Sequence, residues 1–266
     1  MKILITGASS GMGHFLAEQL AKQGHTVWGV SRTPPQATGK AISFRWSRCD
    51  VSDWSATEAL AKEIQKEWGA LDALIAAAGF QGEVGLAMSC DPLQWSKTVQ
   101  GNIDATYFPI RALFPLLRQS STRAKVLCFS GGGATGPRSH FTGYGIAKTA
   151  IVRLVETLAE EWKDLAIDIN SVAPGAIKTA MTEEVVRLGP QRVGQREYES
   201  AVKTLETGGG SLEKVLGLIE VLLSARSHGL SGKLIAAQWD PWGEIESLRD
   251  QIQKTESYTL RRILPS

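Results

Sequence analysis

Short apolar runs alternate along this chain with longer segments in which apolar residues recur at helical spacing. Residues 3–5 form an apolar run that leads into a glycine-rich turn. The segment after the turn carries a helical apolar stripe, formed by Phe15, Leu16, Leu20 and Ala21. Residues 26–30 follow as a second apolar run after Gly24. This order predicts a strand, a glycine turn, a helix and a second, parallel strand.

The same alternation continues toward the end of the chain. Further strands are predicted at residues 41–46, 71–76, 125–129, 167–172 and 234–237. Further helices are predicted at residues 56–68, 93–117, 145–162 and 212–223. Ser52 or Asp53 is expected to cap the first of these helices, and Pro109 to kink the second. Strands that alternate with helices favour an α/β protein, a three-layer doubly wound Rossmann fold with a central parallel sheet.

The chain shows no internal repeat and no linker that would divide it. We therefore expect a single Rossmann-type catalytic domain over residues 1–242. Residues 180–211 break the alternation, because they are polar and end in a run of glycines, and we predict that they form a mobile flap. Residues 243–266 are charged and weakly amphipathic, which predicts a C-terminal arm that is either a surface helix or a subunit contact.

Composition excludes several classes of protein. Hydrophobic residues make up 43% of the 266 residues and charged residues 21%, which favours a packed core over disorder. The net charge of +2 argues against nucleic acid or an anionic membrane as a partner. Cys49, Cys90 and Cys128 are widely spaced and odd in number, which predicts reduced thiols and neither disulfides nor a metal site. No apolar run is long enough for a signal peptide or a membrane span, so we expect a cytoplasmic protein.

The turn after the first strand has the composition of a phosphate-binding loop. A dinucleotide pyrophosphate needs backbone N–H groups at a helix N-terminus, and glycines let the backbone approach it closely. The predicted cofactor contacts of this turn are Gly7, Ser9, Ser10, Gly11, Met12 and Gly13. A glycine turn without a ligand is the alternative, and the position of the turn inside a β-α-β unit weakens it.

The glycine spacing, Gly-x-x-x-Gly-x-Gly, resembles the short-chain dehydrogenase/reductase family in its short, non-extended form. The extended epimerase branch of that family usually has Gly-x-x-Gly-x-x-Gly, so a sugar-nucleotide epimerase is disfavoured. The resemblance implies an oxidoreductase that passes a hydride between a nicotinamide cofactor and a carbonyl or alcohol substrate. It also implies a homodimer or homotetramer, with contacts through the helices near 93–117 and 145–162.

The end of the second strand predicts which nicotinamide cofactor is bound. NAD-specific sites usually have an Asp or Glu here to hold the ribose 2′-hydroxyl, whereas this chain has Ser31 and Arg32. Arg32 can pair with the 2′-phosphate of NADP(H), with a hydrogen bond from Ser31, as in the NADP-preferring members that the sequence resembles. A solvated surface arginine is the alternative. Asp50 and Val51 resemble the family's adenine contact.

Tyr144 and Lys148 are the predicted proton-handling pair. They lie four residues apart, which places them on one face of a helix. A free tyrosine has a pKa of about 10. A nearby ammonium favours the phenolate and is expected to lower the pKa of the tyrosine. Tyr144 would then act as the general acid/base. Both residues are also expected to contact the cofactor, with Lys148 holding the nicotinamide ribose.

The resemblance assigns two further catalytic roles. The family's serine, which polarises the substrate carbonyl, usually lies thirteen residues before the tyrosine, and that position is Gly131 here. We assign the role to Ser130, because the glycines after it can absorb a shift of one residue; a serine that caps its own loop is the alternative. Asn102 matches the helix asparagine whose carbonyl helps hold a proton-relaying water. An asparagine that fixes a helix kink is the alternative to this second role.

Residues 72–79 match the family's Asp-x-Leu-Val-Asn-Asn-Ala-Gly, but Ala76 and Ala77 replace both asparagines. The first of these asparagines usually braces the central sheet, so the brace must come from elsewhere. The remaining cofactor contacts that the resemblance implies are Ala77, Ala78, Gly79, Pro174, Gly175, Ile177 and Thr179.

We therefore expect an NADP(H)-dependent reductase or dehydrogenase without a metal. The alternative is a catalytically weak NADP(H)-binding sensor or scaffold protein, which the two alanines and the shifted serine leave open. The sequence does not specify the substrate, although residues 140–142, the flap and the tail are expected to shape its site. Trp239 and Trp242 could belong to the core, to a subunit interface or to a substrate wall.

Overall fold

The computed structural model describes residues 1–35 and 42–263. Within these residues, seven parallel strands form one sheet in the order β3-β2-β1-β4-β5-β6-β7. The strands are β1 (Lys2–Thr6), β2 (Thr26–Ser31), β3 (Arg45–Arg48), β4 (Ala73–Ala76), β5 (Ala124–Phe129), β6 (Ile167–Ala173) and β7 (Leu234–Ala236). The strand order reverses between β1 and β4, and ligands of open α/β sheets bind beyond the carboxyl ends of the strands at such a point.

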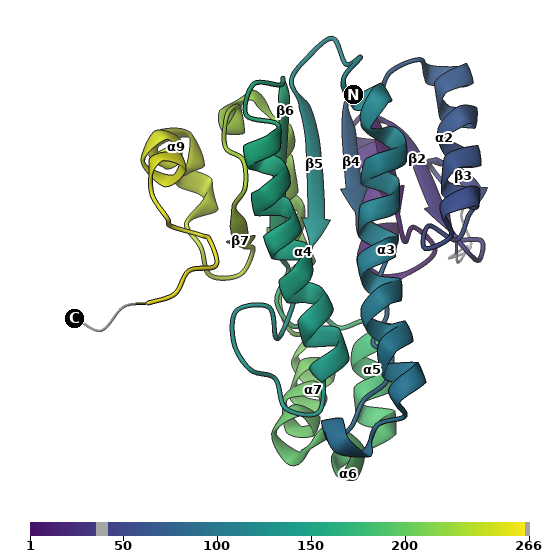
Figure 1. Cartoon of the computed structure of the whole chain (residues 1–266), viewed down its shortest axis with the longest axis vertical. Coiled ribbons are helices and arrows are strands. Elements are labelled where there is room, and N and C mark those ends of the chain that lie inside the picture. The colour runs from purple at the N-terminus through teal and green to yellow at the C-terminus, as the bar shows by residue number, and fades with distance from the viewer. Residues whose placement is uncertain (36–41, 264–266) are drawn as a thin grey trace.

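Helices cover both faces of the sheet (Figure 1). One face is covered by α2 (Trp54–Trp68), α3 (Pro92–Leu117) and α4 (Thr142–Glu161). The other face is covered by α1 (Gly11–Lys22), α8 (Leu212–Leu223) and α9 (Ile245–Lys254). Short 3-10 turns lie at η1 (Ala87–Ser89), η2 (Ala225–Ser227) and η3 (Trp242–Glu244). The predicted three-layer Rossmann fold is therefore confirmed.

The strands alternate their side chains between two apolar cores. In β1, Ile3 and Ile5 pack in the cluster that includes α1 and α8, while Leu4 packs in the cluster that includes α2, α3 and α4. All three side chains are fully buried. Because every strand has helices on both faces, the strands read in the sequence as continuous apolar runs rather than as alternating ones.

Two segments differ from the sequence prediction. The third strand, β3, spans Arg45–Arg48 and begins four residues later than the strand predicted at 41–46. Residue 41 lies outside the described residues. The predicted flap is helical and contains α5 (Ala180–Leu188), α6 (Pro190–Val193) and α7 (Gln195–Thr207). Figure 1 shows these helices beyond the carboxyl ends of the strands. Asp53, and not Ser52, caps α2, with its carboxylate 2.8 Å from the Ala56 nitrogen.

The tail helix α9 packs against the main core. Its Ile245 and Ile252 are buried in the same apolar cluster as β1 and α8. Trp242 packs against that cluster and its indole N–H donates to the Ala237 carbonyl at 2.8 Å, so of the three predicted settings it occupies the core. Among the described residues, no helix is both long enough and apolar enough to cross a membrane.

Candidate active site

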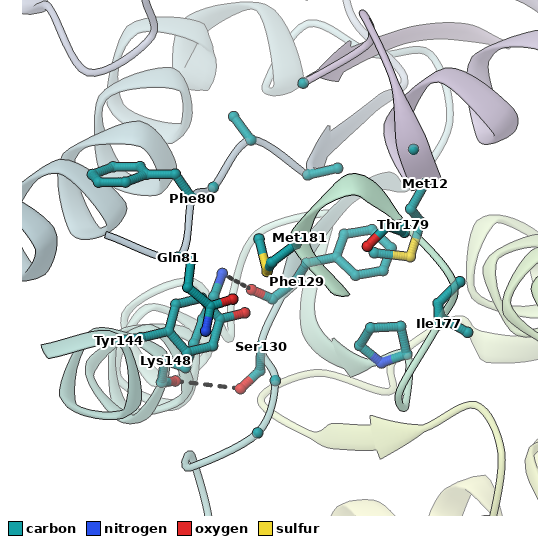
Figure 2. Close-up of a pocket in the computed structure, with 18 of the residues that line it drawn as sticks. Met12, Phe80, Gln81, Phe129, Ser130, Tyr144, Lys148, Ile177, Thr179 and Met181 are labelled. Atoms are coloured by element: carbon teal, nitrogen blue, oxygen red, sulfur yellow. Dashed lines mark hydrogen bonds between the residues drawn. The ribbon is translucent and has the colours of Figure 1, made fainter. Parts of the chain in front are cut away.

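A cavity of about 1190 Å³ opens at the point where the strand order reverses, beyond the carboxyl ends of β1, β4, β5 and β6. Loops from all of these strands and from α4, α5 and α7 line it (Figure 2). Every predicted catalytic or cofactor residue except Asn102 lines this cavity. Residues that are scattered over more than 170 positions of the sequence are therefore gathered in one crevice.

The glycine turn is shaped by close backbone contacts. A Cβ atom at Gly13 would lie 2.4 Å from the Gly7 carbonyl oxygen, so no larger residue fits there without moving the turn. Gly7 has a φ of 74° and lies against the backbone of Ala77 and Ala78, at 3.0 Å from a Cβ built on it. Thr6 binds the two loops together, because its hydroxyl accepts a hydrogen bond from the Ala78 nitrogen at 3.0 Å. This bond joins the ends of β1 and β4 where the family's asparagine is missing.

The N-terminus of α1 faces the cavity and fits a dinucleotide pyrophosphate. Ser10 is its N-cap residue, and the Ser10 side chain makes no capping hydrogen bond. The first N–H groups of a helix have no partner within the helix, so they are available to an anion. Gly11 has a φ of 56°, and a Cβ built there would lie 3.7 Å from the Thr179 side chain. Thr179 therefore lies over the glycine turn from the far side of the crevice (Figure 2).

The end of β2 presents Arg32 to the cavity rim. Arg32 is exposed and lines the cavity, as an arginine that meets a 2′-phosphate must. Ser31 is buried, its hydroxyl donates to the Thr33 carbonyl at 2.7 Å, and it accepts from the Trp46 indole at 2.7 Å. The Ser31 proton is therefore engaged in holding the loop. Burial alone would raise the pKa of Asp50, but hydrogen bonds from Ser52 and the charge of Arg32 lower it overall.

Tyr144 and Lys148 lie on the same face of α4 and both side chains are buried at the cavity wall. The Lys148 Nζ atom lies 5.5 Å from the centre of the Tyr144 ring. It donates to the Phe129 carbonyl at the end of β5, at 2.9 Å, which ties the helix to the sheet (Figure 2). The spacing of four residues thus produces the predicted pair.

Burial determines how both groups titrate. It lowers the pKa of Lys148 to about 8, because the ammonium is taken out of water. It raises the pKa of Tyr144, and the positive charge of Arg138 opposes this only in part. The lowered tyrosine pKa expected from the sequence is therefore wrong in this structure. A tyrosine that stays protonated near neutral pH is suited to donate a proton, as carbonyl reduction requires.

Ser130 and Gly131 lie side by side at the end of β5 but differ in what they face. The Ser130 hydroxyl is buried and donates to the Lys148 carbonyl at 3.3 Å. Gly131 faces the reactive end of the tyrosine, since a Cβ built on Gly131 would lie 3.0 Å from the Tyr144 hydroxyl. The position nearest the acid is therefore the one without a side chain.

Asn102 is fully buried behind the cavity and its amide is fully engaged. The oxygen accepts from the Phe80 nitrogen at 3.1 Å, and the nitrogen donates to the Phe80 and Thr98 carbonyls at 3.0 and 2.9 Å. The Asn102 side chain therefore holds the loop after β4. Gly79 lies between Asn102 and Lys148, because a Cβ on it would be 3.2 Å from the Asn102 amide oxygen and 3.4 Å from the Lys148 Nζ atom.

Sequence reasoning missed several residues that line the substrate side of the cavity. They are Phe80, Gln81 and Arg138; Gly131 was considered only as the vacant serine position, and Glu197 lies within residues 180–211, which were expected to shape the site. Arg138 lies 3.9 Å from the centre of the Phe141 ring and forms an ion pair with Glu197 of α7 at 2.8 Å. Residues 140–142, which were expected to shape the site, do not line it, and Phe141 is fully buried beneath Arg138. The sequence offered no signal for Phe80, Gln81 and Arg138, because they are single residues in loops.

The pattern of matches with known proteins agrees with this geometry. The model of the short chain dehydrogenase family matches residues 1–188. The chain therefore belongs to the short chain dehydrogenase family, whose members are oxidoreductases that use a nicotinamide cofactor.

Individual relatives cover nearly the whole chain. The benzil reductase ((S)-benzoin forming) of Saccharomyces cerevisiae is 27% identical over 258 residues, with 92% of this chain and 98% of the relative covered. A short chain dehydrogenase of Escherichia coli CFT073, solved in complex with NADPH, is 25% identical with a TM-score of 0.74, covering 90% of this chain and 96% of that one. A short chain dehydrogenase/reductase structure from Saccharomyces cerevisiae has a TM-score of 0.80 at 22% identity, with coverage of 90% and 96%, which supports the fold. The protein is thus an oxidoreductase of the kind that transfers a hydride to or from a carbonyl or alcohol carbon.

Proposed function

We propose that this protein is an NADP(H)-dependent reductase of carbonyl compounds, with Tyr144 as the general acid. The observation that carries the proposal is the buried Tyr144–Lys148 pair at the wall of a cavity whose other end is a glycine turn. When bound there, the nicotinamide supplies the hydride. Tyr144 donates its hydroxyl proton to the carbonyl oxygen, so that the carbonyl becomes an alcohol. Lys148 holds the region electropositive and is placed to contact the nicotinamide ribose.

Binding of the cofactor follows from the cradle that the backbone forms. The tight backbone approach at Gly7 and Gly13, and the positive φ of Gly11, leave room for a pyrophosphate at the N-terminus of α1. Pro174, Gly175 and Ile177 line the opposite wall, where the nicotinamide would lie. These residues fit a dinucleotide without rearrangement of the turn.

The preference for NADP(H) rests on Arg32. Its exposed guanidinium at the cavity rim can form paired hydrogen bonds with a 2′-phosphate. No Asp or Glu occupies residues 30–33 to hold a free 2′-hydroxyl. The Escherichia coli relative solved with NADPH supports the same choice.

One observation favours a second candidate, a weakly active NADP(H)-binding sensor. The position that faces the Tyr144 hydroxyl is Gly131, and the neighbouring Ser130 hydroxyl is already engaged. If no other group holds the substrate oxygen, the cofactor could bind without turnover.

The test is a panel of ketones, diketones and aldehydes, read by the loss of NADPH or NADH absorbance. We expect NADPH oxidation with at least one carbonyl, and a loss of about 10²–10⁴-fold in kcat in Tyr144→Phe. Cofactor binding, followed by fluorescence, should stay at the parental level in this variant. Tight NADPH binding without any oxidation would favour the sensor, and parental rates in Tyr144→Phe would remove the assignment of the acid.

The cofactor preference has its own variant. Arg32→Ala should weaken NADPH binding by roughly 10- to 150-fold, since a charge-assisted hydrogen bond contributes roughly 1.5–3 kcal/mol, and should leave NADH binding nearly unchanged. Equal loss for both cofactors, or no loss for either, would contradict the role of Arg32.

A further inference from the structure

Tyr144 is left as a buried phenolate each time it donates its proton. Its O–H bond breaks, a new O–H bond forms on the substrate oxygen, and the electron pair stays on the Tyr144 oxygen until water returns a proton. Tyr144 is only 7% exposed, and burial disfavours its charged form. Lys148 is the cation expected beside it, yet burial lowers the pKa of Lys148 to about 8. A second cation near the ring would therefore favour the phenolate further.

Arg138, from the loop before α4, is such a cation. Its guanidinium carbon lies 5.9 Å from the centre of the Tyr144 ring, and the Lys148 Nζ atom lies at 5.5 Å. The guanidinium also packs at 3.9 Å over the buried Phe141 ring, which fixes its place. Charges about 6 Å apart still interact appreciably at the effective dielectric of a partly exposed site. The phenol thus has two cations at nearly the same distance.

Two consecutive glycines lie beside the Tyr144 hydroxyl and the Arg138 guanidinium. A Cβ on Gly131 would lie 3.0 Å from the hydroxyl, and a Cβ on Gly132 would lie 3.4 Å from the Nη1 atom of Arg138. Both glycines line the cavity. A side chain at either position would displace one of the two groups or come between them, so the glycines keep the cation close to the acid.

Glu197 of α7 neutralises part of the charge of Arg138. The Nε atom donates to one Glu197 carboxylate oxygen at 2.9 Å, and the Nη2 atom lies 2.8 Å from the same oxygen. The two side chains are 21% and 28% exposed, so water screens them in part. Burial raises the pKa of Tyr144, and the charge of Arg138 opposes this rise even with Glu197 in place.

The other charged groups on elements packed around Tyr144 have partners of their own. The Glu184 carboxylate of α5 lies 3.5 Å from the Arg187 guanidinium. Arg192 of α6 pairs with Glu83 at 2.7 Å. Each of these charges is therefore balanced by a neighbour on its own side of the crevice.

The uncharged titratable groups around the ring are also held elsewhere. Burial raises the pKa of the Cys128 thiol of β5 to about 12, so the thiol stays neutral. Tyr198 of α7 packs in the apolar cluster that contains the phenol, and His140 bonds to a backbone carbonyl of α6 at 3.0 Å. This leaves the pair of Arg138 and Glu197 as the charges from outside α4 that act most directly on the phenol.

We propose that Arg138 promotes proton transfer by Tyr144 through its charge, and that Glu197 sets the strength of this effect. Arg138 acts through Tyr144 and is a positioning residue rather than a catalytic one. A merely structural ion pair would give the same result whichever partner is removed, whereas a charge effect gives opposite results. This assignment rests on the proposed reductase function.

The test follows the pH dependence of the reverse reaction, with NADP⁺ and the alcohol formed from a carbonyl that the parent reduces. Tyr144 accepts a proton in this direction, so kcat/KM rises with pH as the Tyr144–Lys148 pair loses a proton, and the midpoint belongs to the pair. Removing a nearby cation raises this midpoint and removing a nearby anion lowers it, whichever member of the pair titrates.

Arg138→Met should move the midpoint up by roughly 0.5–1 pH unit, because methionine keeps apolar contact with Phe141 and has no charge. Glu197→Gln breaks the same ion pair but should move the midpoint down by about 0.5 pH unit, since it frees the charge of Arg138. Arg138→Lys keeps the charge and should stay within about 0.2 pH unit of the parent.

Arg192→Met is the matched control. Arg192 also joins a helix over the strand ends to the loop after β4 through an ion pair, with Glu83 at 2.7 Å, but it does not line the cavity. Its midpoint should stay within about 0.2 pH unit of the parent, because a more distant and exposed charge is screened.

The outcomes separate this assignment from the proposed function. Shifts in opposite directions in Arg138→Met and Glu197→Gln would support the assignment. Shifts in one direction in both variants, or a parental midpoint in Arg138→Met, would overturn it and leave the ion pair a structural link. If Arg138→Met does not fold, Glu197→Gln decides alone, and a midpoint at or above that of the parent overturns the assignment. A parent that binds NADPH and reduces no carbonyl would overturn the proposed function and this assignment with it.

Discussion

Lys148 is a buried amine that the fold holds at a cost in stability. Its ammonium has one hydrogen bond, to the Phe129 carbonyl, and no carboxylate pairs with it among the described residues. Burial lowers its pKa to about 8, from an ordinary value of 10.5. Because burial disfavours the charged form of Lys148, the folded protein is destabilised at every pH at which Lys148 remains an ammonium.

Replacing this amine should therefore stabilise the protein while it abolishes activity. We expect Lys148→Met to raise the free energy of unfolding at pH 7 by about 1–2 kcal/mol, since the relief of burial exceeds the lost hydrogen bond. Between pH 8 and 10.5 the folded parent releases the proton that the unfolded chain still binds, so parental stability rises with pH in this window. The gain of the variant should shrink accordingly. Urea unfolding at pH 7 and pH 10 measures both values, and a gain that is the same at the two pH values would contradict this explanation.

For single residues, the sequence predicted which side chains lie together better than which way each side chain faces. The spacing of Tyr144 and Lys148 determined that they share a helix face, and the structure places them together. Ser130 and Gly131 follow directly after a strand, where successive residues face opposite sides, so a shift of one residue changes what a side chain meets. Gln81 has no spacing signature at all, because its position depends on bonds from a helix about twenty residues away.

The helices α5, α6 and α7 show how an element can be functional without a strong sequence signal. They are short, and their buried residues are few, with Val185, Val193 and Ala201 packed against Phe141 and Tyr144. A polar segment with a few apolar anchors resembles a loop when it is read by periodicity alone. The helices form because they lie over the crevice and cover the aromatic residues beneath it.

The ion pair between Arg138 and Glu197 is the polar link from α7 to the loop before α4. Its two hydrogen-bonding distances are 2.9 and 2.8 Å, and both side chains are partly exposed. A pair of this exposure contributes about 0.5–1 kcal/mol. Glu197→Gln should therefore raise the KM for the carbonyl substrate about two- to fivefold, with unchanged affinity for NADPH.

Steady-state kinetics in varied carbonyl concentration measures this effect. Glu199→Gln is the matched control, because Glu199 lies on the same helix and is exposed, and within the described part of the chain its side chain bonds only to Gln195. A KM in Glu197→Gln that matches the control would show that the ion pair does not hold α7 over the substrate.

For the whole molecule, the sequence predicted the architecture because parallel sheets bury both faces. Continuous apolar runs such as residues 3–5 and 73–76 then stand out between amphipathic helices, and the glycine turn marks where the sheet order reverses. What the sequence did not reveal is how the ends of the chain close the structure. Those contacts join residues that are far apart, such as the bond from the Leu234 nitrogen to the Tyr258 carbonyl.

Residues 255–258 cover the edge of the sheet at β7. The buried Lys233 side chain donates to the Thr255 and Ser257 carbonyls at 2.8 and 3.2 Å, and Tyr258 lines the rim of the cavity. An uncovered edge strand is prone to pair with other chains. The tail therefore connects the stability of the sheet to the shape of the site.

If residues 243–266 are part of the core, truncating one buried side chain in α9 must destabilise the entire protein. Ile245 is only 2% exposed and packs in the cluster that also holds β1 and α8. We expect Ile245→Ala to lower the free energy of unfolding by about 2–4 kcal/mol, as for other large-to-small changes in a packed core. Gln251→Ala, on the exposed side of the same helix, should stay within about 0.5 kcal/mol of the parent. Urea unfolding followed by tryptophan fluorescence gives both values in one cooperative transition. A parental midpoint in Ile245→Ala would mean that the tail is a separable arm, as its weak amphipathic pattern first indicated, and that residues 1–242 fold without it.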